Sequence, residues 1–327
     1  MKLVILGAGA WGTALAVSLC ERHSVTLWGR DAAHLDTLKR ERCNSKYLPG
    51  IALPQNLTLE TQFATALHHA DIALIATSTN GFGATLAKLA AIRRDLPLLW
   101  ACKGFETATG RLPHEIARDH LAPDVPLGAL SGPSFALEVA QGKPTALTLA
   151  SAHAAFTQSM AAALNGHALR IYSSHDLIGV ELGGALKNVV AIAAGISDGL
   201  GLGNNARAAL ITRALAEMAR LGAAMGGQPE TFMGLAGLGD LVLTATGDLS
   251  RNRTVGMLLA RGEKLDDILA RLGHVAEGVH SARAARALAH THKIDMPITE
   301  AVCAVLFSGM PPVEAVRQLL ARDPKTE

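Results

Sequence analysis

One lysine stands in an unusual setting for a charged side chain. Lys187 lies in the apolar, glycine-rich stretch 182–191, whose pattern predicts a helix. A charged group there is costly unless it is paired or used. Burial lowers the pKa of a lysine and can make it a general base, so this setting favours proton transfer at Lys187. The alternative is a lysine whose stem follows the apolar face while its head stays in water.

Two stretches further along supply an acid and a guanidinium. The stretch 237–241, Gly-Leu-Gly-Asp-Leu, contributes Asp240, and the stretch 250–252, Ser-Arg-Asn, contributes Arg251. Both stretches are rich in glycine or polar residues, and we interpret them as turns. Ordinary helix capping is the alternative for each of them.

Two further groups in the first half follow predicted strands. The stretch 131–136, Ser-Gly-Pro-Ser-Phe-Ala, is predicted to open a helix with Pro133 early in it, where the missing N–H costs nothing. Free amides at such a turn can hold a small anion, and a purely structural turn is the alternative. Lys103 comes after the strand 98–101, where α/β sheets place ligands. By itself it also fits a solvated surface lysine.

A glycine pattern at the start of the chain indicates a dinucleotide site. The predicted strand 2–6 runs into Gly7, Gly9 and Gly12, and a predicted helix follows. In this context the first glycine allows a tight turn, the second lets the backbone approach a pyrophosphate, and the third lets the helix pack close to the strand. The amides at the helix N-terminus then hold the anion. A merely structural glycine turn is the alternative.

The end of the second predicted strand bears on the choice of nucleotide. NAD-selective sites place an acid there to bind the ribose 2′-hydroxyl, whereas strand 24–28 is followed by Gly29, Arg30 and Asp31. A guanidinium can hold a 2′-phosphate with two hydrogen bonds, which favours NADP over NAD. In the alternative, Arg30 is a solvated turn residue and Asp31 caps a helix.

Two kinds of secondary structure are expected to position these candidate residues: alternating strands and helices in the first half of the chain, and helices alone in the second. In the first half, short β-branched or leucine-rich runs alternate with helical segments, which implies a parallel sheet with helices on both faces. The predicted strands are residues 2–6, 24–28, 71–77, 97–101, 126–130, 145–149 and 169–172. After about residue 173 only helical segments follow, at residues 176–197, 205–225, 229–233, 255–260, 265–271, 281–290, 299–307 and 312–320.

The sequence therefore predicts two domains. Residues 1–175 are expected to form a Rossmann domain with a doubly wound, mostly parallel α/β sheet, and residues 176–327 an all-α domain. The helix 176–197 is expected to lie along their interface. No linker rich in proline, glycine or serine separates the halves, so we expect a ligand cleft between them.

Composition excludes several classes of function. With 49% apolar and 18% charged residues the chain is expected to be globular. A formal charge of +2 gives no electrostatic case for nucleic acid or an anionic membrane surface, so any anion must be bound locally. The four cysteines and 13 histidines are scattered, which argues against disulfides and a metal site and favours a reducing cytoplasm.

Two stretches imitate membrane-related segments. The apolar run 3–20 resembles a signal peptide, but its glycines fit the dinucleotide turn better. The stretch 144–169 lacks charged residues, yet it is too polar for a bilayer core. We therefore predict no membrane span.

Taken together, the motifs resemble those of the bacterial NAD(P)-dependent glycerol-3-phosphate dehydrogenases, and the resemblance covers almost the whole chain. It rests on the stretches GALKNVVA at 184–191 with Gly195, Asp198, Gly199 and residues 203–205, GAGAWGT at 7–13, WGR at 28–30, ACKG at 101–104, SGPSFA at 131–136, GLAGLGDL at 234–241, SRN at 250–252 and VAEG at 275–278.

The resemblance implies a role for each matching residue. Lys187 would exchange the proton of the C2 oxygen, with Asp240, Asn188 and Lys103 in the catalytic group and Thr244 nearby. Substrate would be bound by Lys103, Gly132, Ser134, Lys187, Asp240, Ser250, Arg251 and Asn252. The cofactor would be bound by Gly7, Gly9, Ala10, Trp11, Gly12, Arg30, Lys103, Ala136, Arg251, Val275 and Glu277.

The implied reaction is a reversible hydride transfer between NAD(P)H and dihydroxyacetone phosphate, giving sn-glycerol 3-phosphate for glycerophospholipid synthesis. NADPH is the favoured cofactor, and the only expected partner is the small-molecule substrate, with room for a homodimer. Two rivals remain, another two-domain β-hydroxyacid or polyol dehydrogenase and a non-enzymatic NADPH sensor. The first would not need the 131–134 turn together with Arg251, and the second would have no reason to place Lys187 in an apolar helix.

Overall fold

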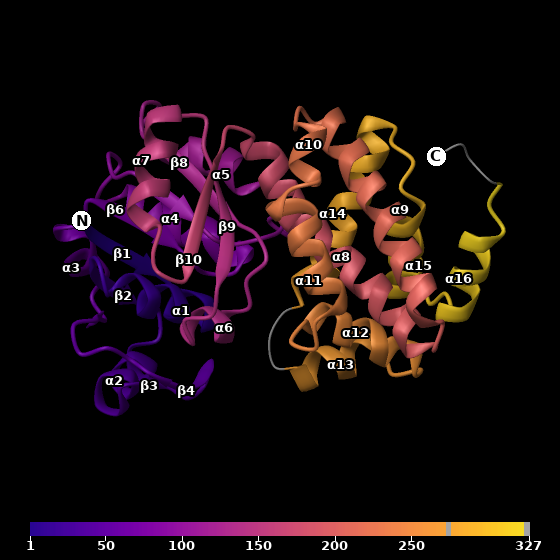
Figure 1. Ribbon diagram of the computed structural model, residues 1–327, viewed down its shortest axis with the longest axis horizontal. Coiled ribbons are helices and arrows are strands. Elements are labelled where there is room, and N and C mark those ends of the chain that lie inside the picture. The colour runs from indigo at the N-terminus through magenta and orange to yellow at the C-terminus, as the bar shows by residue number, and fades with distance from the viewer. Residues whose placement is uncertain (273–275, 324–327) are drawn as a thin grey trace. The chain divides into compact units, whose positions relative to one another are not determined.

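The structure is a computed structural model that describes residues 1–272 and 276–323 (Figure 1). The chain divides into two compact units, Met1–Leu177 and Ile178–Glu327. The first unit carries the strands, and the described part of the second consists of helices.

Within its described residues, the first unit is built on an eight-stranded sheet with the strand order β10-β9-β8-β7-β6-β1-β2-β5. Its strands are β1 (Lys2–Leu6), β2 (Ser24–Trp28), β5 (Thr58–Glu60), β6 (Ile72–Ile75), β7 (Leu98–Trp100), β8 (Leu127–Ser131), β9 (Thr145–Ala150) and β10 (Leu169–Ser174). Every neighbouring pair is parallel except β8 and β9, which are antiparallel. The sheet is thus mostly parallel, as predicted.

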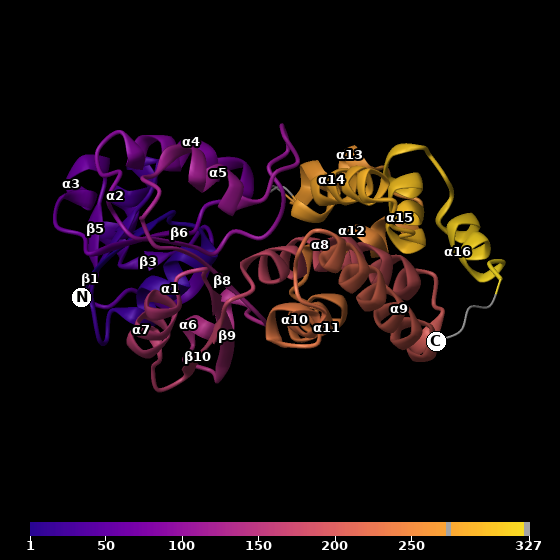
Figure 2. The ribbon, with the colours of Figure 1, turned by 90° about the horizontal axis from the view of Figure 1, so that it is seen from above.

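Helices cover both faces of this sheet (Figure 2). The helices α4 (Thr79–Ala90) and α5 (Pro113–His120) lie on one face, and α1 (Ala10–Leu19), α6 (Ala136–Ala140) and α7 (Ala154–Leu164) lie on the other. The remaining helices of this unit are α2 (Ala32–Glu41) and α3 (Phe63–His68). Because helices cover both faces, the central strands β1 and β6 are buried apart from Lys2, and their buried residues are all apolar.

Some elements of the first unit differ from the sequence prediction. The edge strand β5 and the antiparallel pair β3 (Cys43–Asn44) and β4 (Leu48–Ala52) were not predicted, because they are short and β4 contains a Pro-Gly pair that reads as a turn. Helix α6 begins only at Ala136, three residues after Pro133. The prediction that Pro133 lies in the first turn of a helix is therefore wrong.

The second unit is made of helices around the long helix α8 (Leu177–Gly199). The others are α9 (Gly203–Ala224), α10 (Pro229–Phe232), the π-helical turn η1 (Leu235–Gly239), α11 (Asp240–Thr246), α12 (Arg251–Ala260), α13 (Leu265–Leu272), α14 (Glu277–His292), α15 (Pro297–Phe307) and α16 (Pro312–Leu320). Asp240 thus begins a helix after a π-helical turn. The interpretation of residues 237–241 as an irregular turn is corrected accordingly.

Helix α8 is long and apolar enough to cross a membrane by length and composition alone, and it is the one such helix among the described residues. The core helix of a globular protein has the same length and composition, and 94% of an 18-residue apolar stretch of α8 is buried inside the structure. Its apolar character is accounted for by this burial, since the other helices of the unit pack around it.

Candidate active site

The glycine turn after β1 has the geometry of a nucleotide-binding loop. Gly7 adopts a φ of +130°, and its amide donates to the Trp28 carbonyl at 2.8 Å. A Cβ on Gly12 would lie 1.9 Å from the Gly7 carbonyl oxygen, so only glycine lets α1 start this close to the strand. A Cβ on Gly9 would meet no atom within 4 Å. Gly7 and Gly12 are therefore needed by the fold, whereas Gly9 faces open space.

The N-terminus of α1 can hold an anion in that space. The first amides of a helix have no partner inside the helix, and no side chain caps them at Gly9. Trp11, in the first turn, keeps its buried indole N–H without a hydrogen-bond partner among the described residues. Ala10 and Trp11 are half-buried. This combination fits the pyrophosphate of a dinucleotide.

Asn44 fixes the glycine turn and was missed by sequence reasoning. Its fully buried side-chain amide donates to the Ala8 carbonyl at 3.1 Å and to the Thr13 hydroxyl at 2.8 Å. It therefore ties both ends of the turn to the hairpin of β3 and β4. No periodic pattern surrounds Asn44, so the sequence held no signal that could have found it.

At the end of β2 the two interpretations of Arg30 and Asp31 prove compatible. The Asp31 carboxylate accepts from the His34 amide at 3.1 Å and caps α2, as the capping alternative predicted. Arg30 is exposed and makes no hydrogen bond or ion pair with the described residues. Its guanidinium is therefore free to bind a ligand.

The residues predicted after β7 and β8 meet at one carbonyl. The half-buried Lys103 donates from Nζ to the Gly132 carbonyl at 2.9 Å, and the Ser134 hydroxyl donates to the same oxygen at 3.0 Å. The neighbouring Ser131 hydroxyl is buried and has no hydrogen-bond partner among the described residues. The first unit thus brings Lys103, Gly132 and Ser134 together, with Ala136 at the start of α6.

In the second unit, Lys187 is buried and paired. Its ammonium donates to a carboxylate oxygen of Asp240 and, at 2.9 Å, to the hydroxyl of Thr244. Lys187 is 7% exposed and Asp240 is fully buried. The Thr244 hydroxyl donates to the Asp240 carbonyl at 2.7 Å, which fixes its lone pairs toward the ammonium. The solvated-lysine alternative is therefore wrong, because the carboxylate offsets the burial of the charge.

Close packing explains how these groups meet across 53 residues of sequence. A Cβ on Gly183, one turn before Lys187, would lie 2.5 Å from the Ala236 carbonyl oxygen of η1. The π-helical turn therefore rests directly on the backbone of α8. Asp240 follows it as the first residue of α11, with Thr244 one turn further along the same face.

Asn188 connects three helices. Its side-chain oxygen accepts from the Asn252 amide at 3.0 Å, and the Asn252 oxygen accepts from the backbone N–H of Gly278 at 3.1 Å. The chain of bonds joins α8, α12 and α14. Asn252 thus uses both ends of its side chain to hold the scaffold.

The other predicted residues of this unit lie at helix starts. The Ser250 hydroxyl accepts from the Arg253 amide at 3.3 Å and caps α12, as the capping alternative predicted. Arg251 is exposed and makes no hydrogen bond or ion pair with the described residues. Glu277 is the half-buried first residue of α14. Val275 lies outside the described residues.

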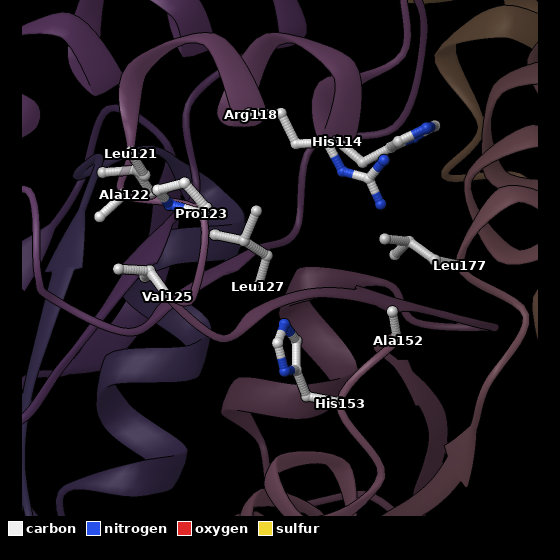
Figure 3. A pocket seen from close by; sticks show the side chains of 10 residues that line it. All are labelled: His114, Arg118, Leu121, Ala122, Pro123, Val125, Leu127, Ala152, His153 and Leu177. Carbon is white, nitrogen blue, oxygen red and sulfur yellow. The ribbon is translucent and has the colours of Figure 1, made fainter.

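A cavity of about 280 Å³ in the first unit is a separate feature. Figure 3 shows Arg118 of α5 and the imidazole of His153 extending toward it from opposite sides. It also borders the buried His114 and the first residue of β8, Leu127. None of the described residues predicted for the site lines this cavity, so it carries no part of the predicted chemistry.

Comparison with known proteins decides the family. The family profile described as NAD-dependent glycerol-3-phosphate dehydrogenase N-terminus matches residues 2–157, and the corresponding C-terminus profile matches residues 176–317. The chain belongs to this family. The prediction of an NAD(P)-dependent oxidoreductase with a Rossmann-type sheet is thereby confirmed.

Individual members of the glycerol-3-phosphate dehydrogenase family align over the full chain. Proteins of Thiobacillus denitrificans and Aromatoleum aromaticum, both named as glycerol-3-phosphate dehydrogenases that use NAD(P)+, are 58% and 55% identical, each over 100% of both chains. The crystal structure of glycerol-3-phosphate dehydrogenase from Coxiella burnetii has a TM-score of 0.93 and 41% identity, covering 98% of this chain and 99% of that one.

Proposed function

We propose that this enzyme reduces dihydroxyacetone phosphate to sn-glycerol 3-phosphate with NADPH, in the cytoplasm, for glycerophospholipid synthesis. Membership of the glycerol-3-phosphate dehydrogenase family supports the reaction. The observation that carries the chemical assignment is the buried ammonium of Lys187, held by Asp240 and Thr244 in an apolar helix bundle. Because burying an ammonium is costly, its presence there favours a chemical role for Lys187.

Lys187 serves as the proton donor in this proposal. The nicotinamide, when bound, supplies the hydride that adds to C2 of the substrate. The C2 oxygen then gains negative charge, and Lys187 gives it a proton, forming the hydroxyl of the product. Asp240 and Thr244 hold the ammonium in place, which reduces the reorganisation needed as that charge develops. In the reverse direction the neutral amine of Lys187 takes the same proton.

The substrate phosphate is proposed to bind at the start of α12. Arg251 offers an exposed guanidinium, and the first backbone amides of the helix have no partner within it. Because the Asn252 side chain is engaged at both ends, we assign its contribution to its backbone N–H. Ser250 caps this helix. In the first unit, the cluster of Lys103, Gly132 and Ser134 is proposed to bind substrate as well.

The cofactor is proposed to bind over Gly9 at the N-terminus of α1. The open space at Gly9, the uncapped amides and the unpartnered indole N–H of Trp11 support this placement. The exposed Arg30 supports NADPH over NADH, because a guanidinium can pair with the 2′-phosphate. Ala136, Val275 and Glu277 stay predictions as further cofactor contacts.

One assay tests the proposal. Oxidation of NADPH is followed with dihydroxyacetone phosphate and with unphosphorylated dihydroxyacetone, and we expect efficient turnover only of the phosphorylated compound. Lys187→Ala should lose about 10² to 10⁴ in kcat while still binding NADPH. Near-normal turnover of that variant would overturn the role of Lys187.

Arg251→Ala tests the phosphate site. A hydrogen bond to a charged group contributes about 1.5–3 kcal/mol, so KM for dihydroxyacetone phosphate should rise roughly ten- to a hundredfold. Arg261→Ala is the matched control, since Arg261 is an exposed arginine at the other end of α12. Equal KM values in the two variants would remove Arg251 from the phosphate site.

A further inference from the structure

Two arginines in the first turn of α12 are placed in opposite ways. Arg251 is exposed and makes no hydrogen bond or ion pair with the described residues. The side chain of Arg253 is only 13% exposed, and it donates from Nε to the Asp198 carboxylate at 2.7 Å and from a terminal nitrogen to the exposed Asp248 carboxylate at 3.0 Å. The Arg253 guanidinium is therefore engaged by carboxylates of this unit, whereas that of Arg251 is available to a ligand.

Asp198 lies near the C-terminal end of α8, in the second unit, and holds two guanidinium groups. One of its oxygens accepts from Arg253 of α12 and the other accepts from Arg207 of α9 at 2.9 Å. The Asp198 side chain is only 10% exposed. A carboxylate this buried between two cations forms a stronger link than a surface ion pair.

The helices α8 and α12 meet backbone to backbone, side by side in Figures 1 and 2. A Cβ on Gly195 would lie 2.0 Å from the Arg253 carbonyl oxygen, and a Cβ on Gly256 would lie 2.0 Å from the Ile192 carbonyl oxygen. Contact through glycines sets how near the helices come. By itself it does little to prevent one helix from sliding or turning against the other, because a glycine has no side chain that could interlock with the facing helix.

Specific side-chain bonds must therefore set the register of α12. Asn252 bonds to Asn188 on one side of the glycine contact, and Arg253 bonds to Asp198 at the far end of α8. The two anchors are adjacent in α12 and ten residues apart in α8, about 15 Å along its axis. Anchors spread this widely resist both sliding and rotation of the first turn of α12.

We propose that Asp198, acting through Arg253, is a positioning residue that aims the first turn of α12 at the substrate phosphate. The inference rests on the proposed phosphate site at Arg251. In this view the Asp198–Arg253 pair contacts no substrate. It keeps the Arg251 guanidinium and the first amides of α12 at the place where the phosphate binds, so it acts on substrate affinity more than on hydride transfer.

The test compares three variants that each remove a group from the same cluster. Asp198→Asn and Arg253→Met each break the Asp198–Arg253 bond between α8 and α12, and we expect each to raise KM for dihydroxyacetone phosphate at least tenfold. The kcat and the Kd for NADPH should stay within about threefold of wild type. Arg207→Met is the matched control, because it removes the other cation from Asp198 without touching α12, and its KM should change less than twofold.

Further measurements exclude a merely structural effect. A variant that only loses stability has less active protein and a lower melting temperature, yet its folded fraction keeps the wild-type KM. Arg253→Lys, which keeps the charge but has one donor group instead of a fork, should recover part of the lost affinity. The double variant Asp198→Asn/Arg253→Met should raise KM by much less than the product of the two single effects, since both changes remove the same Asp198–Arg253 bond.

The outcomes separate this proposal from the one on which it rests. A rise in KM for Arg251→Ala with an unchanged KM for both Arg253→Met and Asp198→Asn would overturn the positioning role alone. The same rise in KM for Arg207→Met as for Arg253→Met would also overturn it, because the effect would then follow the charge on Asp198. An unchanged KM for Arg251→Ala would overturn the phosphate site itself.

Discussion

The buried pair of Lys187 and Asp240 allows folding and catalysis to be separated by a double-mutant cycle. Lys187→Met removes the ammonium but keeps an apolar stem, and Asp240→Asn removes the carboxylate charge while keeping its shape. Each single variant leaves one buried charge without its counterion, whereas the double variant leaves none. All three should lose the proposed proton transfer, so activity and stability are expected to respond differently.

The expected magnitudes follow from burial. Removing one partner of a buried ion pair costs about 3–5 kcal/mol. In Lys187→Met the stranded Asp240 carboxylate has no free helix N-terminus beside it, because the π-helical turn η1 runs directly into α11, so a cost of about 3–5 kcal/mol is expected. In Asp240→Asn the Lys187 ammonium keeps its hydrogen bond to the Thr244 hydroxyl but has no counterion, so a cost of about 3–5 kcal/mol is expected here as well. We expect a coupling energy of about 2–3 kcal/mol in the double variant.

The assay is urea unfolding at pH 7, followed by far-ultraviolet circular dichroism for the helical second unit. All three tryptophans, Trp11, Trp28 and Trp100, belong to the first unit, so tryptophan fluorescence provides an internal control. If the two single costs add within about 0.5 kcal/mol, the charges are not coupled and the reasoning fails. A double variant that regains stability and also regains turnover would refute the catalytic role of Lys187.

Three further predictions concern other sites. Gly9→Ala should keep wild-type stability and weaken NADPH binding at least tenfold, whereas Gly12→Ala should unfold more easily because its Cβ meets the turn backbone. Isothermal titration measures the NADPH affinity of both variants, and thermal melting measures their stability. Unchanged NADPH affinity in Gly9→Ala would contradict the placement of the pyrophosphate. Arg30→Ala should lower the preference for NADPH over NADH in kcat/KM by roughly ten- to a hundredfold, with Arg22→Ala, another exposed arginine, leaving that ratio unchanged. Burial raises the pKa of Glu217 to about 7 from its ordinary 4.5, so the folded protein keeps a proton that the unfolded chain releases; stability present below pH 4.5 is lost as the pH rises to 7. Glu217→Gln should remove this loss, and melting curves from about pH 4 to 8 that stay parallel for the two proteins would show the carboxyl is not responsible.

Much of the cofactor half could be predicted because its signals are local. The strands β1 and β6 are continuous apolar runs, and the turn at Gly7 lies between a strand and a helix within a dozen residues. The hairpin of β3 and β4 escaped prediction because its strands are too short to show a period. Asn44 was missed with it, although its buried side chain holds the turn.

The sequence by itself determined that Lys187 stands in an apolar helix and that such a charge requires a partner or a use. It did not determine which acid pairs with it, because Asp240 lies 53 residues away and meets it only through the contact of η1 with α8.

The two arginines of α12 make the same point. Arg251 and Arg253 are equivalent as sequence, and only the packing of α12 against α8 leaves Arg251 exposed and covers most of the Arg253 side chain beside Asp198. Composition and local pattern fix which groups are present, whereas long-range packing fixes which of them meet, because burial and pairing are properties of surfaces that form only when distant segments come together.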